Sequence, residues 1–405
     1  MAATAMTDRT AAPPRDRATA EPSVQAIIAA ARRPQAAPSR GAWLCGAASG
    51  LLWYLSFFPA NLGPLAFLAP VPLLLLVRAE ERPRRMYLAV YLTWLAATLT
   101  AMFWMAANGP MVPAWVALSL YLALYAPAFL LVSRTAVHRL RVSLVVAAPL
   151  AWVGLEFLRA HLMTGFAWYF LGHTQWRWTT LIQIGDLVGV YGISFVVMAC
   201  AAAVAVCVPG TAFAKLKLLP TRDVVTAPAP VESTRRKVLS VGFALVLLAA
   251  ALGYGFVRQA GEKFTPGPRM ALVQGNFPSD IGDKHSPGEV WFMHNRLTAM
   301  GVQHQPDFVI WPESGFRWPL LQAGEGMTAA QLRAAAPKIP VEEWGTTGKE
   351  VPGMLQDLAT QANAGLLVGL TAFTADEEHG MRRFNSAAFS RPELGLMGRY
   401  DKRHR

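Results

Sequence analysis

The sequence predicts a multi-pass α-helical membrane bundle followed by an α/β domain, and three observations support this fold class. Hydrophobic residues make up 54% of the 405 residues and charged residues 15%, against roughly 45–50% and about 25% in soluble domains. Long stretches almost free of charge recur through the first 265 residues. From Arg269 onward, short β-like runs alternate with helical ones, which is typical of an α/β sheet.

The charge distribution excludes a nucleic-acid-binding protein. The net charge is +12 and the sequence pI about 10.0, which would suit a polyanion partner if the charge lay on a soluble domain. Residues 1–265, however, hold 23 Lys and Arg and 10 Asp and Glu, whereas residues 266–405 hold 14 and 15. The basic excess therefore lies in the apolar part, where it reports membrane orientation.

Seven apolar stretches predict the membrane bundle. A bilayer core takes about 20 apolar residues, and shorter runs span it where the bilayer thins. The first two stretches are short enough to form one kinked hairpin. The seven comprise residues 43–58, 65–77, 86–107, 112–133, 142–155, 187–208 and 238–257.

The basic residues between these stretches predict their orientation. The amino-terminal segment and the connections after the second, fourth and sixth stretches hold 19 Lys and Arg, and the alternate connections hold four. Because basic connections stay in the cytoplasm, we expect a cytoplasmic amino terminus and a final domain outside. The predicted parts are a disordered cytoplasmic tail (1–40), a transmembrane bundle (41–258), a linker (259–268) and a partial periplasmic domain (269–405).

A charged, aromatic segment follows the fifth stretch, on the predicted outer side. Glu156 and Arg159 stand three residues apart on one helical face, where they can form a salt bridge at the hydrocarbon boundary. Alternatively, one of them faces a lipid headgroup or a polar cavity. Trp168 and its aromatic neighbours predict either an interfacial belt or the wall of an acyl-chain or headgroup site.

The final domain alternates predicted strands and helices. The sequence assigns no helix or strand to residues 319–352, and a mobile arm is one interpretation of this stretch. The predicted strands cover 270–274, 308–311 and 366–371, the helices 288–303 and 354–363, and a hairpin joins 384–389 to 396–400 across 392–395.

Two charged residues follow strand ends, where such folds place their chemistry. Glu313 comes after the apolar strand that ends at Trp311, and we expect Trp311 to shield its carboxylate and partial burial to raise its pKa toward that of a general base. Lys402 follows the last strand. Each residue taken alone also suits a structural role, Glu313 as a cap or turn residue and Lys402 on a solvated face.

The ordered motifs of both parts resemble the apolipoprotein N-acyltransferases, a bacterial inner-membrane family with a periplasmic domain of the nitrilase (carbon-nitrogen hydrolase) fold, an αββα sandwich. The resemblance covers about residues 43–405. The matching motifs are LEFLRAHLMTGFAWYFLGHTQ (155–175), GDLVGVYGISFVV (185–197), LVQGNFP (272–278), DFVIWPES (307–314), LLVGLTAF (366–373), FNSAAF (384–389) and GRYDKRH (398–404).

The resemblance implies a Glu, Lys and Cys triad, with Glu313 as the general base and Lys402 stabilising the oxyanion. A cysteine would take a fatty acyl chain from a phospholipid and pass it, through a thioester, to the N-terminal amine of the diacylglyceryl cysteine of an apolipoprotein. The implied partners are the phospholipid donor, the apolipoprotein acceptor and the bilayer. Substrate contacts are expected from Glu156, Arg159, Trp168, Gln175, Asn276, Trp311 and Asn385.

The sequence departs from the family at the nucleophile. Its three cysteines, Cys45, Cys200 and Cys207, all lie in apolar stretches, and none follows Cys207. We therefore expect a chain truncated at its C-terminus and inactive as written, with an incomplete sandwich. Two alternatives stay open: a non-catalytic membrane protein that binds lipid or lipoprotein, and a membrane-tethered nitrilase-type amidase. The cysteine and histidine spacings predict no metal site, and no cofactor is expected.

Overall fold

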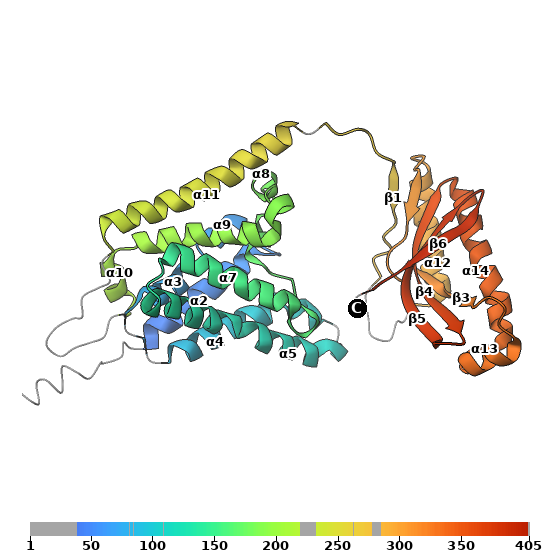
Figure 1. The fold of residues 1–405 in the computed structure, drawn as a ribbon, viewed down its shortest axis with the longest axis horizontal. Coiled ribbons are helices and arrows are strands. Elements are labelled where there is room, and N and C mark those ends of the chain that lie inside the picture. The colour runs from blue at the N-terminus through green and yellow to red at the C-terminus, as the bar shows by residue number, and fades with distance from the viewer. Residues whose placement is uncertain are drawn as a thin grey trace, which may run out of the picture. The chain divides into compact units, whose positions relative to one another are not determined.

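The computed structural model describes residues 39–80, 82, 83, 85–107, 109–218, 232–261, 263–277 and 285–403. Two compact units follow one another along the chain, residues 1–262 and 263–405. Figure 1 shows the first as a bundle of helices and the second as a sheet with helices packed on it. The predicted tail (1–40) falls outside the described residues except for Ser39 and Arg40.

The first unit is helical throughout its described elements (Figure 1). Its α-helices are α2 (Ser39–Ser56), α3 (Val71–Arg78), α4 (Met86–Ala101), α5 (Val112–Ala123), α6 (Tyr125–Arg134), α7 (Leu144–His161), α8 (Thr179–Ile182), α9 (Gly185–Cys207), α10 (Gly210–Lys215) and α11 (Thr234–Gly261). Shorter 3-10 turns include η1 (Gly63–Phe67) and η6 (Leu171–Gln175), and a π-turn, η4 (Thr135–Arg139), follows α6.

Each predicted apolar stretch coincides with helix. Four helical segments of the described residues are long and apolar enough to cross a membrane: Gly109–Arg139, Leu144–Thr164, Gly185–Cys207 and Thr234–Gly261. Shorter apolar helices lie at Gly63–Arg78 and Met86–Ala101. The outward side chains of α11 are apolar and exposed, Val246 at 68% for example. Exposed apolar side chains on long helices are stable in lipid and not in water, so this unit is a membrane-embedded bundle.

A short segment after α7 folds back into the bundle. The chain leaves α7 through a 3-10 turn, continues without regular secondary structure and is extended at Phe170, directly before η6 begins. Phe170 and Leu171 are fully buried there, and the Tyr169 hydroxyl donates to the Ala101 carbonyl at 2.9 Å. The segment is therefore part of the packed bundle, not a surface loop.

The second unit is built on one mixed sheet. The strands run in the order β1 (Met270–Leu272), β2 (Phe308–Ile310), β4 (Gly365–Asp376), β5 (Gly380–Arg391) and β6 (Gly395–Asp401), and β3 (Phe316–Ala323) also pairs with β4. The first three pair in parallel, as does β3 with β4, whereas β4, β5 and β6 are antiparallel. The predicted order of fold classes, a membrane bundle and then an α/β unit, is confirmed.

The helices of this unit pack on the sheet and form its core. α12 (Pro287–Val302) joins β1 to β2, and α13 (Ala329–Ala335) and α14 (Val341–Ala362) lie between β3 and β4. Alternate residues of β4, Leu366, Val368 and Leu370, are buried against Val351 and Leu355 of α14. This alternation is the period of a half-buried strand and fixes which side chains face away from the helices.

The stretch 319–352 is ordered, so a mobile arm there is wrong. It contains the end of β3, α13 and the first half of α14. The Thr328 hydroxyl accepts from the Gln331 backbone N–H at 3.3 Å and so caps α13, and Trp344 and Leu332 are buried in a small cluster with Leu321. The local sequence does not predict these elements, because Pro319 lies in a strand and Pro352 lies inside a helix. Proline is usually absent from strand interiors and from helix interiors.

Candidate functional site

Glu313 lies on a tight turn at the carboxyl end of β2. The turn is closed by the Gly315 N–H, which donates to the Pro312 carbonyl at 2.9 Å, and Ser314 takes the left-handed conformation (φ +58°). Gly369 of β4 passes directly beneath it: a Cβ there would lie 2.5 Å from the Pro312 oxygen and 2.6 Å from the Glu313 Cα. The absence of a side chain at Gly369 thus lets the turn rest on the sheet.

Lys402 and Asn385 meet Glu313 at this edge. The Lys402 Nζ lies 3.4 Å from the Glu313 Oε1, and the Asn385 Nδ2 donates to the same oxygen. The Lys402 backbone N–H also donates to the Asn385 carbonyl at 2.9 Å. Asn385 therefore ties β6 to β5 through its backbone and holds the Glu313 carboxylate through its side chain.

The electrostatics of Glu313 differ from the expectation. The Asn385 hydrogen bond lowers the pKa of Glu313 from its ordinary value, the Lys402 charge lowers it further, and burial opposes this only slightly. The Glu313 side chain is 63% exposed and that of Lys402 51%. The expected burial and raised pKa are therefore wrong, because the turn points the carboxylate outward at the sheet edge, where hydrogen bonding to the charged form dominates.

Trp311 does not shield Glu313. It is 3% exposed, and its Nε1 donates to the Thr298 hydroxyl of α12 at 2.9 Å. Trp311 lies two residues after the buried Val309, and residues two apart along a strand point to the same face, so its ring packs in the core on the helix side of the sheet. The substrate contact assigned to Trp311 stays a prediction, as does that of Asn276, which is exposed in the left-handed conformation (φ +53°).

His294 of α12 was not identified from the sequence. It is 1% exposed, its Nδ1 donates to the Gly315 carbonyl at 3.1 Å, and its Nε2 is buried without a hydrogen-bond partner among the described residues. A Cβ on Gly275 would lie 2.8 Å from that Nε2. His294 thus packs between the Glu313 turn and the segment after β1. Burial lowers the pKa of His294, although its bond to Gly315 opposes this.

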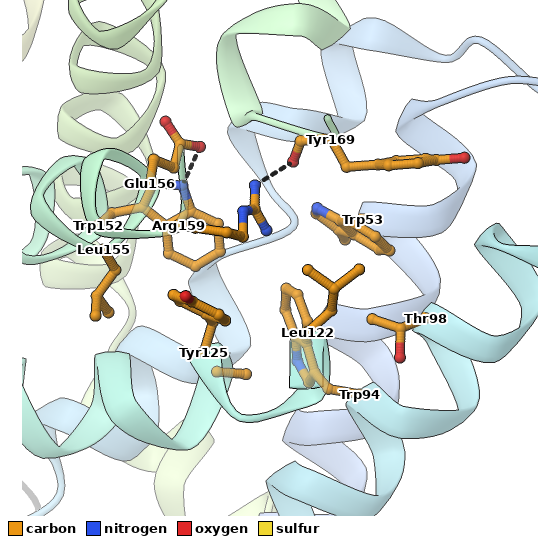
Figure 2. A pocket seen from close by; sticks show the side chains of 11 residues that line it. Trp53, Trp94, Thr98, Leu122, Tyr125, Trp152, Leu155, Glu156, Arg159 and Tyr169 are labelled. Atoms are coloured by element: carbon orange, nitrogen blue, oxygen red, sulfur yellow. Dashed lines mark hydrogen bonds between the residues drawn. The ribbon is translucent and has the colours of Figure 1, made fainter. Parts of the chain in front are cut away.

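In the helical unit, Glu156 and Arg159 line a small aromatic cavity of about 30 Å³ (Figure 2). Both are buried, at 4% and 9% exposure. Trp53, Trp94, Tyr125, Trp152 and Tyr169 form most of its wall. These five aromatic residues come from α2, α4, α6, α7 and the segment after α7, so no local sequence pattern could have grouped them.

The predicted salt bridge between Glu156 and Arg159 is wrong: within the described part of the chain the two form no ion pair. The Glu156 Oε1 accepts from the Trp152 Nε1 at 2.8 Å and from the Leu171 N–H at 2.7 Å. The Arg159 Nη2 donates to the Trp168 and Tyr169 carbonyls at 3.0 and 3.3 Å. Both side chains instead form hydrogen bonds to the segment that folds back after α7.

The remaining predicted residues of this unit have separate environments. Trp168 is 54% exposed and stacks on Trp104, with ring centroids 5.5 Å apart, as expected of an aromatic residue that faces lipid. Gln175 is fully buried, and its Nε2 donates to the Gly63 carbonyl at 2.9 Å. Gln175 therefore joins η6 to η1. The predicted substrate contacts of Trp168 and Gln175 stay predictions.

The structure shows no candidate metal centre among the described residues. Cys45 is buried, Cys200 half-buried and Cys207 exposed, and all three lie in helices of the first unit. The groups that meet at the Glu313 site are the Glu313 carboxylate, the Lys402 ammonium and the Asn385 amide, all from the second unit.

The fold and the site define a class of protein: a polytopic membrane protein whose α/β domain carries a carboxylate–lysine pair at a sheet edge. Residues 49–203 match the family described as apolipoprotein N-acyltransferase N-terminal domain. An apolipoprotein N-acyltransferase of Geobacter metallireducens is 32% identical over 89% of this chain and 63% of its own length. By sequence, the chain is similar to the apolipoprotein N-acyltransferases in both of its parts.

Further relatives carry the same name. The protein of Rhodopirellula baltica is 32% identical over 74% of this chain and 53% of its own length. The protein of Vibrio cholerae is 28% identical over 67% of this chain and 50% of its own length. The chain thus spans between half and about two thirds of the length of these relatives.

Proposed function

We propose that this protein serves the N-acylation of lipoproteins, transferring a fatty acyl chain from a phospholipid to the N-terminal amine of a diacylglyceryl cysteine. The observation that carries the proposal is the placement of Glu313, Lys402 and Asn385 at one sheet edge, in a homologue of enzymes with that name. Both proposed substrates are membrane-bound, which agrees with a chain whose first unit is a membrane bundle.

Glu313 takes the role of general base in this proposal. Its lowered pKa keeps it ionised at neutral pH, so it can accept a proton. An efficient base, however, has a pKa near the working pH, and a thiol has an ordinary pKa of about 8.5. We therefore propose that substrate covers the open edge during the reaction, and that the loss of water there raises the pKa of Glu313.

Lys402 stabilises the negative charge that develops on the substrate carbonyl. Glu313 would take the proton of the thiol, and the thiolate would attack the ester carbonyl of the phospholipid, whose oxygen becomes an oxyanion. The ester C–O bond would then break, and the lysophospholipid would leave with the proton that Glu313 returns. The Lys402 ammonium lies beside Glu313 and is exposed enough to reach such an oxygen. An amine would then attack the resulting thioester and lose a proton to Glu313, and the C–S bond would break to release the thiolate as the amide forms. Fixed positive charge near a developing oxyanion lowers the barrier for both steps.

The thiol must come from outside residues 263–405, because these residues contain no cysteine. This observation favours a second candidate function, in which these 405 residues bind phospholipid or lipoprotein without turnover. In both cases the chain would recognise the same membrane-bound substrates. The two candidates differ in whether an acyl group becomes attached to the protein.

The segment after α7 is proposed to contribute to lipid recognition. Glu156 and Arg159 hold it in place, and Trp168 projects from it to the surface. Together with Gln175, Asn276, Trp311 and Asn385, these residues form the proposed set of substrate contacts. The proposed location is the bacterial cytoplasmic membrane, with the amino terminus in the cytoplasm and the α/β unit in the periplasm.

A reconstituted assay tests the proposal. The protein, expressed from its native gene, is incorporated into phospholipid vesicles with a synthetic diacylglyceryl-cysteine peptide, and the peptide mass is followed. Acyl transfer predicts a mass increase of one fatty acyl group that Lys402→Gln strongly reduces. An unmodified peptide that still binds the vesicle-bound protein supports the non-catalytic candidate and contradicts acyl transfer. Arg391→Gln, an exposed change at the far end of β5, is the matched control.

A further inference from the structure

A second cavity lies at the other end of the helical unit, away from Arg159. It has a volume of about 260 Å³ and lies where α3, η4, α7, α9 and α11 meet. Ser143 and Leu144 line it at the first turn of α7, whereas Arg159 lies near the last turn, about 22 Å away along the helix axis. The connections that form it follow the second, fourth and sixth apolar stretches, which are the basic ones.

Three guanidinium groups line this cavity. Arg78 is 5% exposed and donates through Nη1 to the Val208 carbonyl at 3.0 Å and to the Ala205 carbonyl, so it is fixed against the last turn of α9. Arg141 is exposed, and the described residues offer it no ion pair. Arg236 is 3.4 Å from the Glu232 carboxylate and 76% exposed. The cavity thus contains one rigid cation and two adjustable ones.

The start of α7 adds to this positive potential. Its N-cap residue, Ser143, makes no side-chain cap, and the first N–H groups of an 18-residue helix lack intrahelical partners and carry a partial positive charge. Guanidinium groups and helix N-termini are the groups that bind phosphate oxygens in proteins. The cavity therefore has the donors that a phosphate group requires.

Its other lining residues favour a lipid as the source of the phosphate. Val137, Val142, Leu144 and Val206 form an apolar wall beside the charged groups, and such a wall suits the glycerol carbons and first methylenes of a lipid. Glu80 and Glu232 also line the cavity and can accept hydrogen bonds from a headgroup hydroxyl or ammonium. Basic pockets between transmembrane helices bind phospholipid headgroups in this way.

We propose that this cavity is a phospholipid headgroup site in which Arg78, Arg141, Arg236 and the N-terminus of α7 bind the phosphate. It is separate from any acyl-donor site at the Arg159 end, and it does not depend on the proposed acyl transfer. A lipid bound there would join α7 to α3, α9 and α11.

Calorimetric titration of the full chain in dodecyl maltoside, a phosphate-free detergent, tests the proposal. The probes are short-chain dihexanoyl phosphatidylglycerol, dihexanoylglycerol without the phosphate, and inorganic phosphate. We expect phosphatidylglycerol to bind, and Arg141→Gln combined with Arg236→Gln to weaken it at least about tenfold, a loss of about 1.4 kcal/mol. Arg139→Gln removes the same charge from an exposed position outside the cavity and should bind like the unchanged protein.

The outcomes are distinct. Equal affinity of the double variant and the unchanged protein would overturn the site. Dihexanoylglycerol binding as tightly as phosphatidylglycerol would overturn the role of the phosphate, and equally tight inorganic phosphate would overturn the lipid assignment. Both substituted arginines are exposed, so we expect an unchanged thermal midpoint without lipid; if the double variant fails to fold, Arg141→Gln alone repeats the test.

Discussion

The Lys402 Nζ lies 3.4 Å from the Glu313 Oε1, although 89 residues separate them. The sheet register brings them together: β2 runs parallel to β4, Asn385 of β5 stands opposite Thr371 of β4, and Lys402 follows β6 beside Asn385. An exposed ion pair contributes little to stability, typically about 0–1 kcal/mol. The pair therefore adds little to the stability of the fold, which agrees with the chemical role proposed for it.

Replacing Asn385 by alanine should raise the pKa of Glu313. Its amide hydrogen bond is the largest single cause of the lowered pKa, and a carboxylate that loses a hydrogen bond to its charged form becomes easier to protonate. The measurement is a pH titration of 13C-labelled glutamate carboxyls by NMR, with the signal assigned by its loss in Glu313→Gln. Lys402→Gln should raise the pKa as well, because both the charge and the hydrogen bond of Lys402 lower it. An unchanged pKa in Asn385→Ala would show that the amide does not hold the carboxylate.

Gly369→Ala should displace the Glu313 turn. The added Cβ would lie 2.5 Å from the Pro312 oxygen and 2.6 Å from the Glu313 Cα, and both are backbone atoms that cannot rotate away. We expect a loss of about 1–3 kcal/mol in the free energy of unfolding and a Glu313 pKa nearer its ordinary value. Thermal unfolding and the same NMR titration measure these. Gly353→Ala in α14 is the control, because its Cβ would meet nothing within 4 Å; equal effects of both changes would contradict the close approach.

His294→Phe should remove a pH dependence of stability. Burial lowers the pKa of His294 below its ordinary value of 6.5, so the unfolded chain takes up a proton first as the pH falls. The free energy of unfolding should then decrease below about pH 6.5 in the unchanged protein, and the variant should lack this contribution.

At neutral pH the same variant should lose about 1–3 kcal/mol of unfolding free energy, since the Gly315 carbonyl loses its partner. Unfolding curves recorded between weakly acidic and neutral pH measure both effects. The exposed His304, changed to asparagine, should leave the neutral-pH stability within about 0.5 kcal/mol of the unchanged protein. A pH profile of His294→Phe identical to that of the unchanged protein would rule out His294 as the titrating group.

Glu156→Ala should loosen the segment after α7. The Leu171 N–H and the Trp152 Nε1 would lose the acceptor they share, and an unsatisfied buried donor costs about 1–3 kcal/mol. A lower thermal midpoint in detergent and faster proteolysis after residue 162 are expected. His161→Ala, at an exposed position on the same helix, should change neither by comparison. Intact resistance to proteolysis in Glu156→Ala would mean that the carboxylate does not anchor this segment.

Much of the fold was predictable because its signals are local. The apolar stretches of the bundle, and the strands and helices around 288–303 and 366–371, each contain their own periodicity or composition. The π-turn after α6 and the strand containing Pro319 have no such signal, because packing against α7 and pairing with β4 override the local preference. Those elements could be found only in the folded chain.

The candidate site likewise has features that the sequence predicts and features that only the folded chain shows. Glu313 and Lys402 were predicted because each follows a strand, and resemblance placed both in one site. The exposure of Glu313 depends on Ser314 and Gly369, and the burial of His294 on three separate segments. The separation of Glu156 from Arg159 similarly depends on backbone groups of residues 168–171. Spacing along a helix cannot reveal such competing partners.

The most direct test of the proposed chemistry is the attachment of an acyl group to the protein. The protein, expressed from its native gene, is incubated with a phospholipid that carries an alkyne-tagged acyl chain, and protein-bound label is measured before and after hydroxylamine, which cleaves thioesters. We predict a hydroxylamine-sensitive label that disappears in Glu313→Gln and persists in Arg391→Gln. A label of equal intensity in Glu313→Gln, or no label in the unchanged protein, would contradict the assignment of Glu313 and Lys402 to acyl transfer.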